Sequence, residues 1–309
     1  MNIKELYKEG INIQKYFREQ KGVQENDTDS ILYSYDYQAG SYTQGYLDEK
    51  TTKYKCLLDG KEKYMTVQEK VALRSLCIWE ELNALNVKTV LEVGVGEATN
   101  LADIVLASKG KISYSGLELS LSRLFYAKKF ADYKQVTIDF VCGNMFSLPY
   151  EDNSFDAILL IHCLESNTGR EKEALEELLR VTRKYVILLE PSFELGNEET
   201  KKHISEYCYI QNLQATIKEL KLNVIKNELF RISDYNNNTG LTIIEKNNQG
   251  ATPGDGYACP KCKLKLNRYK EACFCPECFS LYPIYHDIPV LNPDCAVFCS
   301  KYEQGELFC

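Results

Sequence analysis

The sequence predicts an α/β fold with a mostly parallel sheet, followed by a small second domain. Two observations lead to this prediction. Short apolar runs alternate with segments of helical period from residue 66 to 246, as in a parallel sheet whose strands are joined by helices. Beyond residue 256, five of the thirteen cysteines fall between residues 259 and 278, which is typical of a metal-stabilised module.

Composition limits the class of protein. The chain has 309 residues, 44% of them hydrophobic, which is enough for one large domain and a small one. It has no run of eighteen apolar residues and no signal-peptide pattern at its start, so we expect a cytoplasmic protein without a membrane partner. The net charge of −7 disfavours nucleic acid as a partner of the whole chain.

The first 65 residues are expected to form a helical segment. Apolar side chains over residues 2–20 have the spacing of one amphipathic helix, and the polar run 24–30 ends it. A tyrosine-rich stretch, residues 31–42, comes next. By composition alone it is a half-buried packing segment, a common setting for tyrosine.

A second helix is predicted over Thr66–Leu85, where Thr66 and Glu69 have the spacing of a capping box. Arg74 lies on this helix. It could reach a ligand carboxylate at the end of the neighbouring strand, although a solvated arginine is the commoner situation.

Residues 89–100 form the stretch around which the large domain is organised. Val90, Leu91 and Val93 suit a buried strand, and Gly94 and Gly96 suit a tight turn that lets a ligand approach the backbone. A helix follows. The dinucleotide-binding fingerprint would need a third glycine where Thr99 stands, and Glu92 lies inside the strand, so a different nucleotide-like ligand is indicated.

Two further strands end in polar side chains. The strand over 111–117 ends at Glu118, with Leu119 beside it, and a carboxylate there can accept hydrogen bonds from both hydroxyls of a ribose. The strand over 136–141 is followed by Asn144 and Met145, which offer an amide and a flexible apolar surface.

The rest of the large domain continues the alternation of strands and helices. A strand over 157–161 ends at His162; a helix over 170–183, a strand over 185–189 and a helix over 199–220 follow. The strands 222–232 and 241–246 are joined by a turn-rich segment, so the last pair is predicted to be an antiparallel hairpin.

The motif Glu92-x-Gly94-x-Gly96 resembles motif I of the class I S-adenosylmethionine-dependent methyltransferases. Leu148-Pro149 followed by Ser154-Phe155-Asp156 resembles the segment before the fourth strand of the type-11 members. The resemblance covers roughly residues 30–246. It implies a Rossmann-like, seven-stranded, mostly parallel sheet with an antiparallel terminal hairpin strand, spanning residues 66–247.

The resemblance also implies a cofactor and the residues that hold it. The glycine turn and Glu92 would contact the methionine part of S-adenosylmethionine, and Glu118 with Leu119 would contact its ribose. Asn144 would bond the adenine amino group, and Met145 would pack on the adenine ring.

The tyrosine-rich stretch resembles the Tyr-Asp-x-x-Ala-x-x-Tyr segment that forms a lid over the cofactor in many small-molecule methyltransferases, which implies that Tyr35 and Tyr42 contact the cofactor. His162 is the candidate catalytic base, because an imidazole can take a proton from a hydroxyl or amine. A purely structural histidine is the alternative, since many methyl transfers need only alignment.

Residues 248–256 are expected to be a linker to a zinc-ribbon domain over 257–309. Cys259, Cys262, Cys275 and Cys278 form two C-x-x-C knuckles that can close four thiolates around a structural zinc ion, with Cys273 as a competing ligand. Residues 282–291 resemble a strand of the small zinc-ribbon family that includes methyltransferase-activating subunits, although Asp287 stands where that family has glycine.

The sequence therefore favours a cytoplasmic S-adenosylmethionine-dependent methyltransferase that acts on a small molecule, for example a sugar or a nucleotide-linked metabolite. One alternative is an RNA methyltransferase that docks through Lys263, Lys265 and Arg268 of the ribbon, although the module from residue 257 onward carries six basic and six acidic side chains. A second alternative is a non-catalytic protein that only binds the cofactor.

Overall fold

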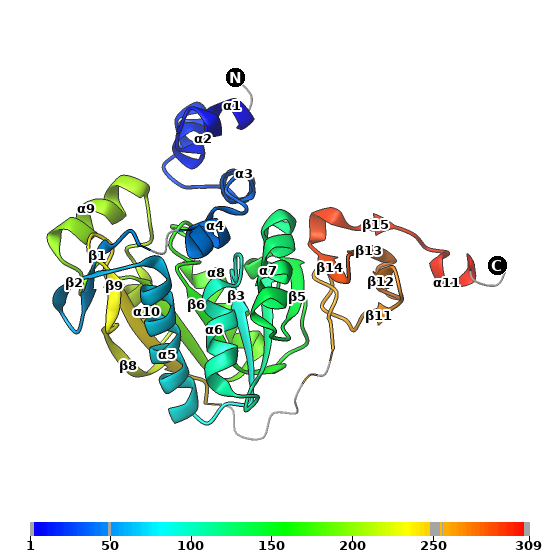
Figure 1. The fold of residues 1–309 in the computed structure, drawn as a ribbon. Helices are drawn as coiled ribbons and strands as arrows, with labels where there is room; N and C mark the ends of the chain where they lie inside the picture. The colour runs from blue at the N-terminus through cyan, green and yellow to red at the C-terminus, as the bar shows by residue number, and fades with distance from the viewer. Residues whose placement is uncertain (1–2, 49–50, 248–253, 255, 306–309) are drawn as a thin grey trace.

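The computed structural model describes residues 3–48, 51–247, 254 and 256–305. Its centre is a mixed sheet (Figure 1) in which five strands run parallel in the order β5-β4-β3-β6-β7. β10 is antiparallel to both β7 and the edge strand β8. The bounds are β3 (Thr89–Val93), β4 (Ser113–Glu118), β5 (Asp139–Gly143), β6 (Phe155–Ile161), β7 (Thr182–Pro191), β8 (Asn223–Leu229) and β10 (Thr239–Glu245). The predicted parallel strands and terminal antiparallel strand are confirmed.

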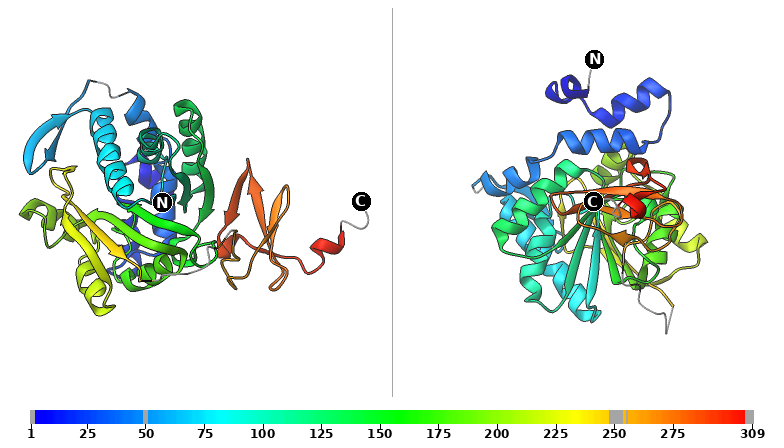
Figure 2. Two further views of the ribbon diagram at one scale, coloured as in Figure 1. Left: turned by 90° about the horizontal axis from the view of Figure 1, so that it is seen from below. Right: turned by 90° about the vertical axis from the view of Figure 1, so that its right-hand side faces the viewer.

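The sheet does not stop at the seven strands that we predicted. β14 (Ile288–Leu291) of the C-terminal domain pairs in parallel with β5, Val290 opposite Cys142 and Leu291 opposite Gly143. Through β14 the sheet continues into β11 (Asn267–Arg268), β12 (Ala272–Phe274), β13 (Ser280–Tyr285) and β15 (Val297–Phe298), twelve strands in the part of the chain that the structure describes. Figure 2 shows the C-terminal domain beyond β5 at the edge of the large domain.

Helices cover both faces of the sheet, as alternating apolar side chains require. Val90 points to the face covered by α5 (Val67–Ala84), α6 (Thr99–Ser108) and α7 (Leu121–Lys134). Its neighbour Leu91 points to the face covered by α8 (Glu171–Val181) and α10 (Leu213–Glu219). The predicted capping box at Thr66 and Glu69 is present at the start of α5.

The N-terminal segment differs from the prediction in two ways. The single helix expected over 2–20 is two helices, α1 (Ile3–Lys8) and α2 (Ile13–Lys21), because Gly10 adopts φ +71° and Asn12 caps a new start. A hairpin, β1 (Tyr54–Leu58) and β2 (Lys61–Met65), lies within the segment expected to be helical. All of β2 except Met65 is exposed, so its sequence carries no alternating pattern.

The helices α3 (Thr28–Tyr37) and α4 (Ser41–Asp48) lie above the carboxyl ends of the central strands, with α1 and α2 beyond them (Figure 1). The hairpin pairs with β9 (Ile232–Asp234) in a separate three-stranded sheet. The strand expected over 222–232 is therefore divided, because β8 stays in the large sheet and β9 leaves it.

The helix expected over 199–220 is also divided, into α9 (Glu198–Tyr207) and α10. Cys208 ends α9 in the left-handed conformation, with φ +55°. The short elements are the 3-10 turns η1 (Met145–Ser147) and η2 (Pro293–Cys295), and α11 (Tyr302–Gly305).

The predicted linker, residues 248–256, lies outside the described residues except for Gly254 and Gly256. Among the helices that the structure describes, none combines the length and the apolar character needed to cross a membrane.

Candidate functional site

A cavity of about 540 Å³ lies at the carboxyl ends of the central strands, beneath α3 and α4. Parallel sheets bind ligands at this edge, because loops from neighbouring strands diverge there. Every residue that the sequence predicted for the cofactor or for catalysis lines this one cavity: Tyr35, Tyr42, Glu92, Gly94, Gly96, Glu118, Leu119, Asn144, Met145 and His162. Arg74 lines it as well.

The turn after β3 leaves no room for a side chain at Gly94. Gly94 has φ +75°, and a Cβ atom there would lie 2.1 Å from the Sγ atom of Cys163. The amides of Gly94 and Val95 both donate to the carbonyl of Leu117, at 2.8 and 3.0 Å, which holds the turn against β4. The backbone of the turn therefore forms a wall of the cavity.

Glu118 lines the cavity beside the glycine turn. Its Oε2 accepts the amide of Gly96 at 2.9 Å, and its Oε1 accepts the amide of Ser120 at 3.0 Å. These two bonds fix the carboxylate at the end of β4, between the glycine turn and the start of α7.

Glu92 is buried, and its Oε2 atom has no hydrogen-bond partner among the described residues. Burial, and then the nearby Glu118 carboxylate, raise the pKa of Glu92 well above its ordinary value. A cationic ligand group would satisfy this oxygen and lower that pKa.

Unpaired polar atoms concentrate in this cavity. Of the eight buried side-chain atoms without a hydrogen-bond partner in the described part of the chain, five belong to residues that line it: Arg74 Nη2, Glu92 Oε2, Asn100 Oδ1, Arg123 Nε and Asn237 Oδ1. Of these, Arg74 Nη2 lies 3.7 Å from Asp234 Oδ2, an ion pair that is longer than a hydrogen bond. Buried polar groups are normally hydrogen-bonded. The cavity therefore has the donors and acceptors of a site for a polar ligand.

At the far end of the cavity, Asn144 follows β5 and caps the turn η1. Its Oδ1 accepts the amide of Phe146 at 3.0 Å. Asn144 and Met145 both line the cavity, and Asn144 keeps its NH₂ group and the second lone pair of Oδ1 for a ligand.

The sequence did not single out Arg123, which is the third residue after the helix cap Ser120. Its guanidinium lies 5.3 Å from the ring of Tyr35 and 4.8 Å from that of Tyr42, so it joins the two predicted lid tyrosines. An arginine in a helix is so common that only its place beside Ser120 could have drawn attention to it.

His162 ends β6 in the left-handed conformation, with φ +51°. Its Nδ1 lies 2.9 Å from Glu165 Oε2, and its Nε2 lies 2.8 Å from the hydroxyl of Thr239. Burial lowers the pKa of His162, but the Glu165 carboxylate outweighs this effect, so the pKa is raised overall. Both ring nitrogens are thus engaged within the protein.

A buried carboxyl group that the sequence did not indicate lies behind this loop. Glu190, in β7, accepts the amides of Cys163 and Leu164 at 2.9 Å and that of Glu165 at 3.2 Å. Burial, and then the Glu165 carboxylate, raise the pKa of Glu190 to about 7.

We expect this carboxyl to make stability depend on pH. Its pKa is higher in the folded protein than in the unfolded chain, so its contribution is complete below about pH 4.5 and is lost as pH rises through about 7. The free energy of unfolding should fall across this interval by at most about 1.4 kcal/mol per pH unit. Glu190→Gln should flatten the decrease. Urea titrations at several pH values measure it, and equal slopes in both proteins would contradict the assignment.

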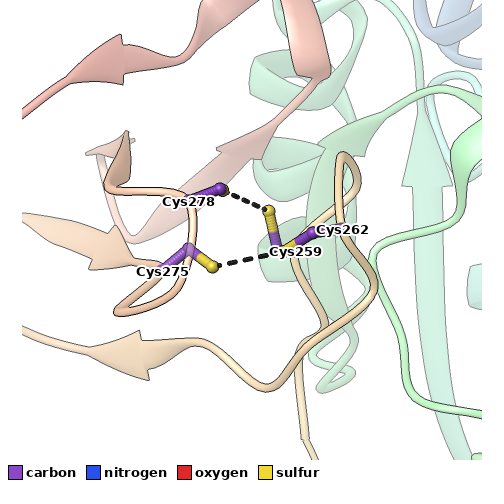
Figure 3. Close-up of side chains that lie close together, drawn as sticks. All are labelled: Cys259, Cys262, Cys275 and Cys278. Carbon is purple, nitrogen blue, oxygen red and sulfur yellow. Dashed lines mark hydrogen bonds between the residues drawn. The ribbon is translucent and has the colours of Figure 1, made fainter.

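The C-terminal domain brings the four predicted cysteine ligands together. The sulfur atoms of Cys259, Cys262, Cys275 and Cys278 all lie within 4.8 Å of one another (Figure 3). The Sγ atoms of Cys259 and Cys278 are 3.6 Å apart, and those of Cys262 and Cys275 are 3.4 Å apart. Cys273 lies buried in β12 and does not belong to this group.

Part of the large domain is similar to known proteins. Residues 90–185 match the family model described as a methyltransferase domain. Demethylmenaquinone methyltransferase from Renibacterium salmoninarum is 29% identical over 143 residues, which are 44% of this chain and 57% of that protein. The chain thus spans about half the length of the curated relatives that it matches.

Two solved structures share the fold. Magnesium protoporphyrin IX methyltransferase from Synechocystis PCC 6803 with bound SAH is 12% identical, with a TM-score of 0.52 over 71% of this chain and 100% of that one. The cyclase SpnF is 14% identical, with a TM-score of 0.54 over 72% of this chain and 97% of that one. The chain therefore shares a Rossmann-like α/β fold with these two proteins, and its residues 90–185 are similar to a methyltransferase domain.

Proposed function

We propose that the protein is an S-adenosylmethionine-dependent methyltransferase that acts on a small-molecule acceptor. The observation that carries this proposal is that every residue expected to hold the cofactor lines one cavity, in which five buried polar atoms lack a hydrogen-bond partner. The match of residues 90–185 to a methyltransferase domain supports the same activity.

The side chains fit the chemical groups of the cofactor. The Oε2 atom of Glu92, which has no hydrogen-bond partner, suits an ammonium group. Arg74 Nη2 lies 3.7 Å from Asp234 Oδ2 but makes no hydrogen bond, so it keeps a donor for a ligand carboxylate. Glu118 is fixed by two amides and keeps lone pairs for ribose hydroxyls. The second lone pair of Asn144 Oδ1 can accept from the adenine amino group, and Met145 suits the face of the ring.

The bound cofactor would supply a methyl group on a positively charged sulfur. The task of the protein is then to align the acceptor with that methyl group and to exclude water. In this proposal α3 and α4 act as the lid, and the ends of β3, β4 and β6 hold the reactants beneath it.

A small acceptor is favoured by the position of the cavity beneath the helices of the N-terminal segment. The names of two similar proteins, demethylmenaquinone methyltransferase and magnesium protoporphyrin IX methyltransferase, also refer to small molecules. The cavity lining includes Lys70, Asp234 and Asn237, so a polar acceptor such as a sugar or a nucleotide-linked metabolite is our specific proposal.

We propose His162 as the base for an acceptor hydroxyl or amine. If Glu165 accepts the Nδ1 hydrogen, Nε2 is the proton acceptor, and the acceptor group would replace the Thr239 hydroxyl there. His162→Asn keeps a residue that tolerates positive φ, and it should lower kcat by about 100-fold or more. Thr239→Val should leave kcat within a few-fold of the original value. A His162→Asn enzyme with ordinary kcat would refute the role.

We further propose that the four cysteines bind a structural zinc ion. The four sulfur atoms come from two separate turns, and four thiolates leave no open position on a tetrahedral metal. The RNA-docking alternative loses part of its basic surface, because Lys263 is paired with Glu177 of α8 at 2.7 Å.

Calorimetric titration with S-adenosylhomocysteine tests the cofactor, and transfer of labelled methyl groups to extracted metabolites tests the reaction. We expect micromolar binding and label in the small-molecule fraction. No binding at millimolar ligand would overturn the proposal. Label in RNA would favour the RNA alternative, and binding without any transfer would favour a non-catalytic protein.

A further inference from the structure

We propose that Glu97, a residue of the glycine turn, positions the lid by capping the helix α4. This inference rests on the proposed cofactor function, because it concerns how the lid and the cofactor turn depend on one another. It assigns a role to a buried carboxylate that neither the motif nor the proposed cofactor contacts use.

The lid helix cannot supply its own cap. The residue before α4 is Gly40, with φ +98°, and a Cβ atom there would lie 2.8 Å from the ring of Tyr126. A serine, aspartate or asparagine, the usual capping residues, would be strained and would clash at this position. The first amides of α4 therefore need an acceptor from elsewhere in the chain.

Glu97 provides that acceptor. Its Oε1 accepts the amide of Gly40 at 2.9 Å, and its Oε2 accepts the amide of Thr43 at 2.7 Å and the Thr43 hydroxyl at 2.6 Å. In a capping box the same two amides, at the cap position and three residues later, are bonded by side chains of the helix itself. Here the carboxylate of Glu97, which lies outside α4, accepts both of these amides.

The position of Glu97 connects the lid to the ligand-binding carboxylate. The preceding residue, Gly96, donates its amide to Glu118. A second link runs from Glu118 through Ser120, whose hydroxyl donates to Asp36 of α3 at 2.6 Å. A ligand that orders Glu118 and the glycine turn would thus order the cap of the lid, and a seated lid would favour the ligand to the same extent.

The experiment measures S-adenosylhomocysteine affinity by calorimetry and amide hydrogen exchange over residues 40–48, with and without ligand. Glu97→Ala should raise Kd by up to about tenfold, because the stability lost with a helix cap would here fall on the seated lid of the ligand-bound state. It should also accelerate exchange at Gly40 and Thr43 and abolish the slowing that the ligand causes in the unaltered protein. Thr43→Val, made from the lid side, should give a smaller change in the same direction.

A double variant and a control variant separate the role of Glu97 from unspecific effects of substitution. Thr43→Val should add nothing in a Glu97→Ala background, because Glu97→Ala already removes the hydrogen bond from the Thr43 hydroxyl to Glu97. Glu198→Ala, at an exposed carboxylate on α9, should change neither measurement. If the unaltered protein does not bind the ligand, the proposed function fails. If it binds and Glu97→Ala keeps its affinity, the role of Glu97 fails; if Glu97→Ala does not fold, unchanged affinity of Thr43→Val refutes it.

Discussion

Removing the proposed zinc ion from the C-terminal domain, or replacing Cys275 by serine, is expected to unfold that domain. About fifty residues form too small a core to fold securely without a metal or disulfides. Binding of a structural zinc ion contributes roughly 10 kcal/mol to such domains. We expect one zinc ion per chain in the unaltered protein, and in Cys275→Ser the loss of both the zinc and the slow amide exchange of β12 and β13.

The effect should extend into the large domain, because the two domains share a sheet and a core. Val290 and Leu291 of β14 pair with β5, and both side chains are buried. When β14 no longer pairs with β5, the edge of β5 is exposed to solvent directly before Asn144 and Met145. We therefore expect faster exchange in β5 as well, and a lower melting temperature for the whole chain.

Cys273→Ala is the matched control. Cys273 is as buried as Cys275, and it lies two residues away in sequence, but it is outside the cluster of four sulfur atoms. This variant should lose some packing energy, about 1 kcal/mol for a small cavity, and keep its zinc. If Cys275→Ser retained the metal and the melting temperature, or if Cys273→Ala lost the metal, the assignment of the ligands would be wrong.

The sequence was most informative where one physical requirement dominates. Buried parallel strands need continuous apolar runs, and the runs around Val90 and Ile158 placed the central strands correctly. The hairpin β1–β2 was missed because β2 is almost wholly exposed, so solvent and not a core determines its side chains. The pairing of β14 with β5 could not be predicted, because nothing in a strand of four residues specifies a partner in another domain.

The residues of the site also divide into those that the sequence could indicate and those that it could not. Glu118 could be predicted because it stands at the end of a strand, where the topology fixes its neighbours, whereas Glu92 and Asn144 were indicated by the resemblance to methyltransferase motifs. Arg123, Glu97 and Glu190 could not, since their roles depend on contacts with the lid or a distant loop. Tertiary contacts between segments far apart in sequence leave no periodic signal in either segment.

Glu118→Ala is expected to weaken binding of S-adenosylhomocysteine by roughly 100-fold, or about 3 kcal/mol. In our proposal the carboxylate bonds two ribose hydroxyls, and hydrogen bonds to a charged group contribute about 1.5–3 kcal/mol each. The alanine would also leave the amides of Gly96 and Ser120 without their acceptor, so the glycine turn and the start of α7 lose their connection. Calorimetric titration of folded variants measures the change in Kd.

Glu118→Gln separates the two causes. Its single amide oxygen can accept from one of the two backbone amides, whereas its NH₂ group would face the other donor. We therefore expect a loss between those of the unaltered protein and the alanine variant. Glu219→Ala, at an exposed carboxylate on α10, should leave Kd unchanged. Glu118 accepts the amides of both Gly96 in the glycine turn and Ser120 next to the lid. An unchanged Kd in Glu118→Ala would therefore place the nucleoside elsewhere and remove the basis of the proposed site.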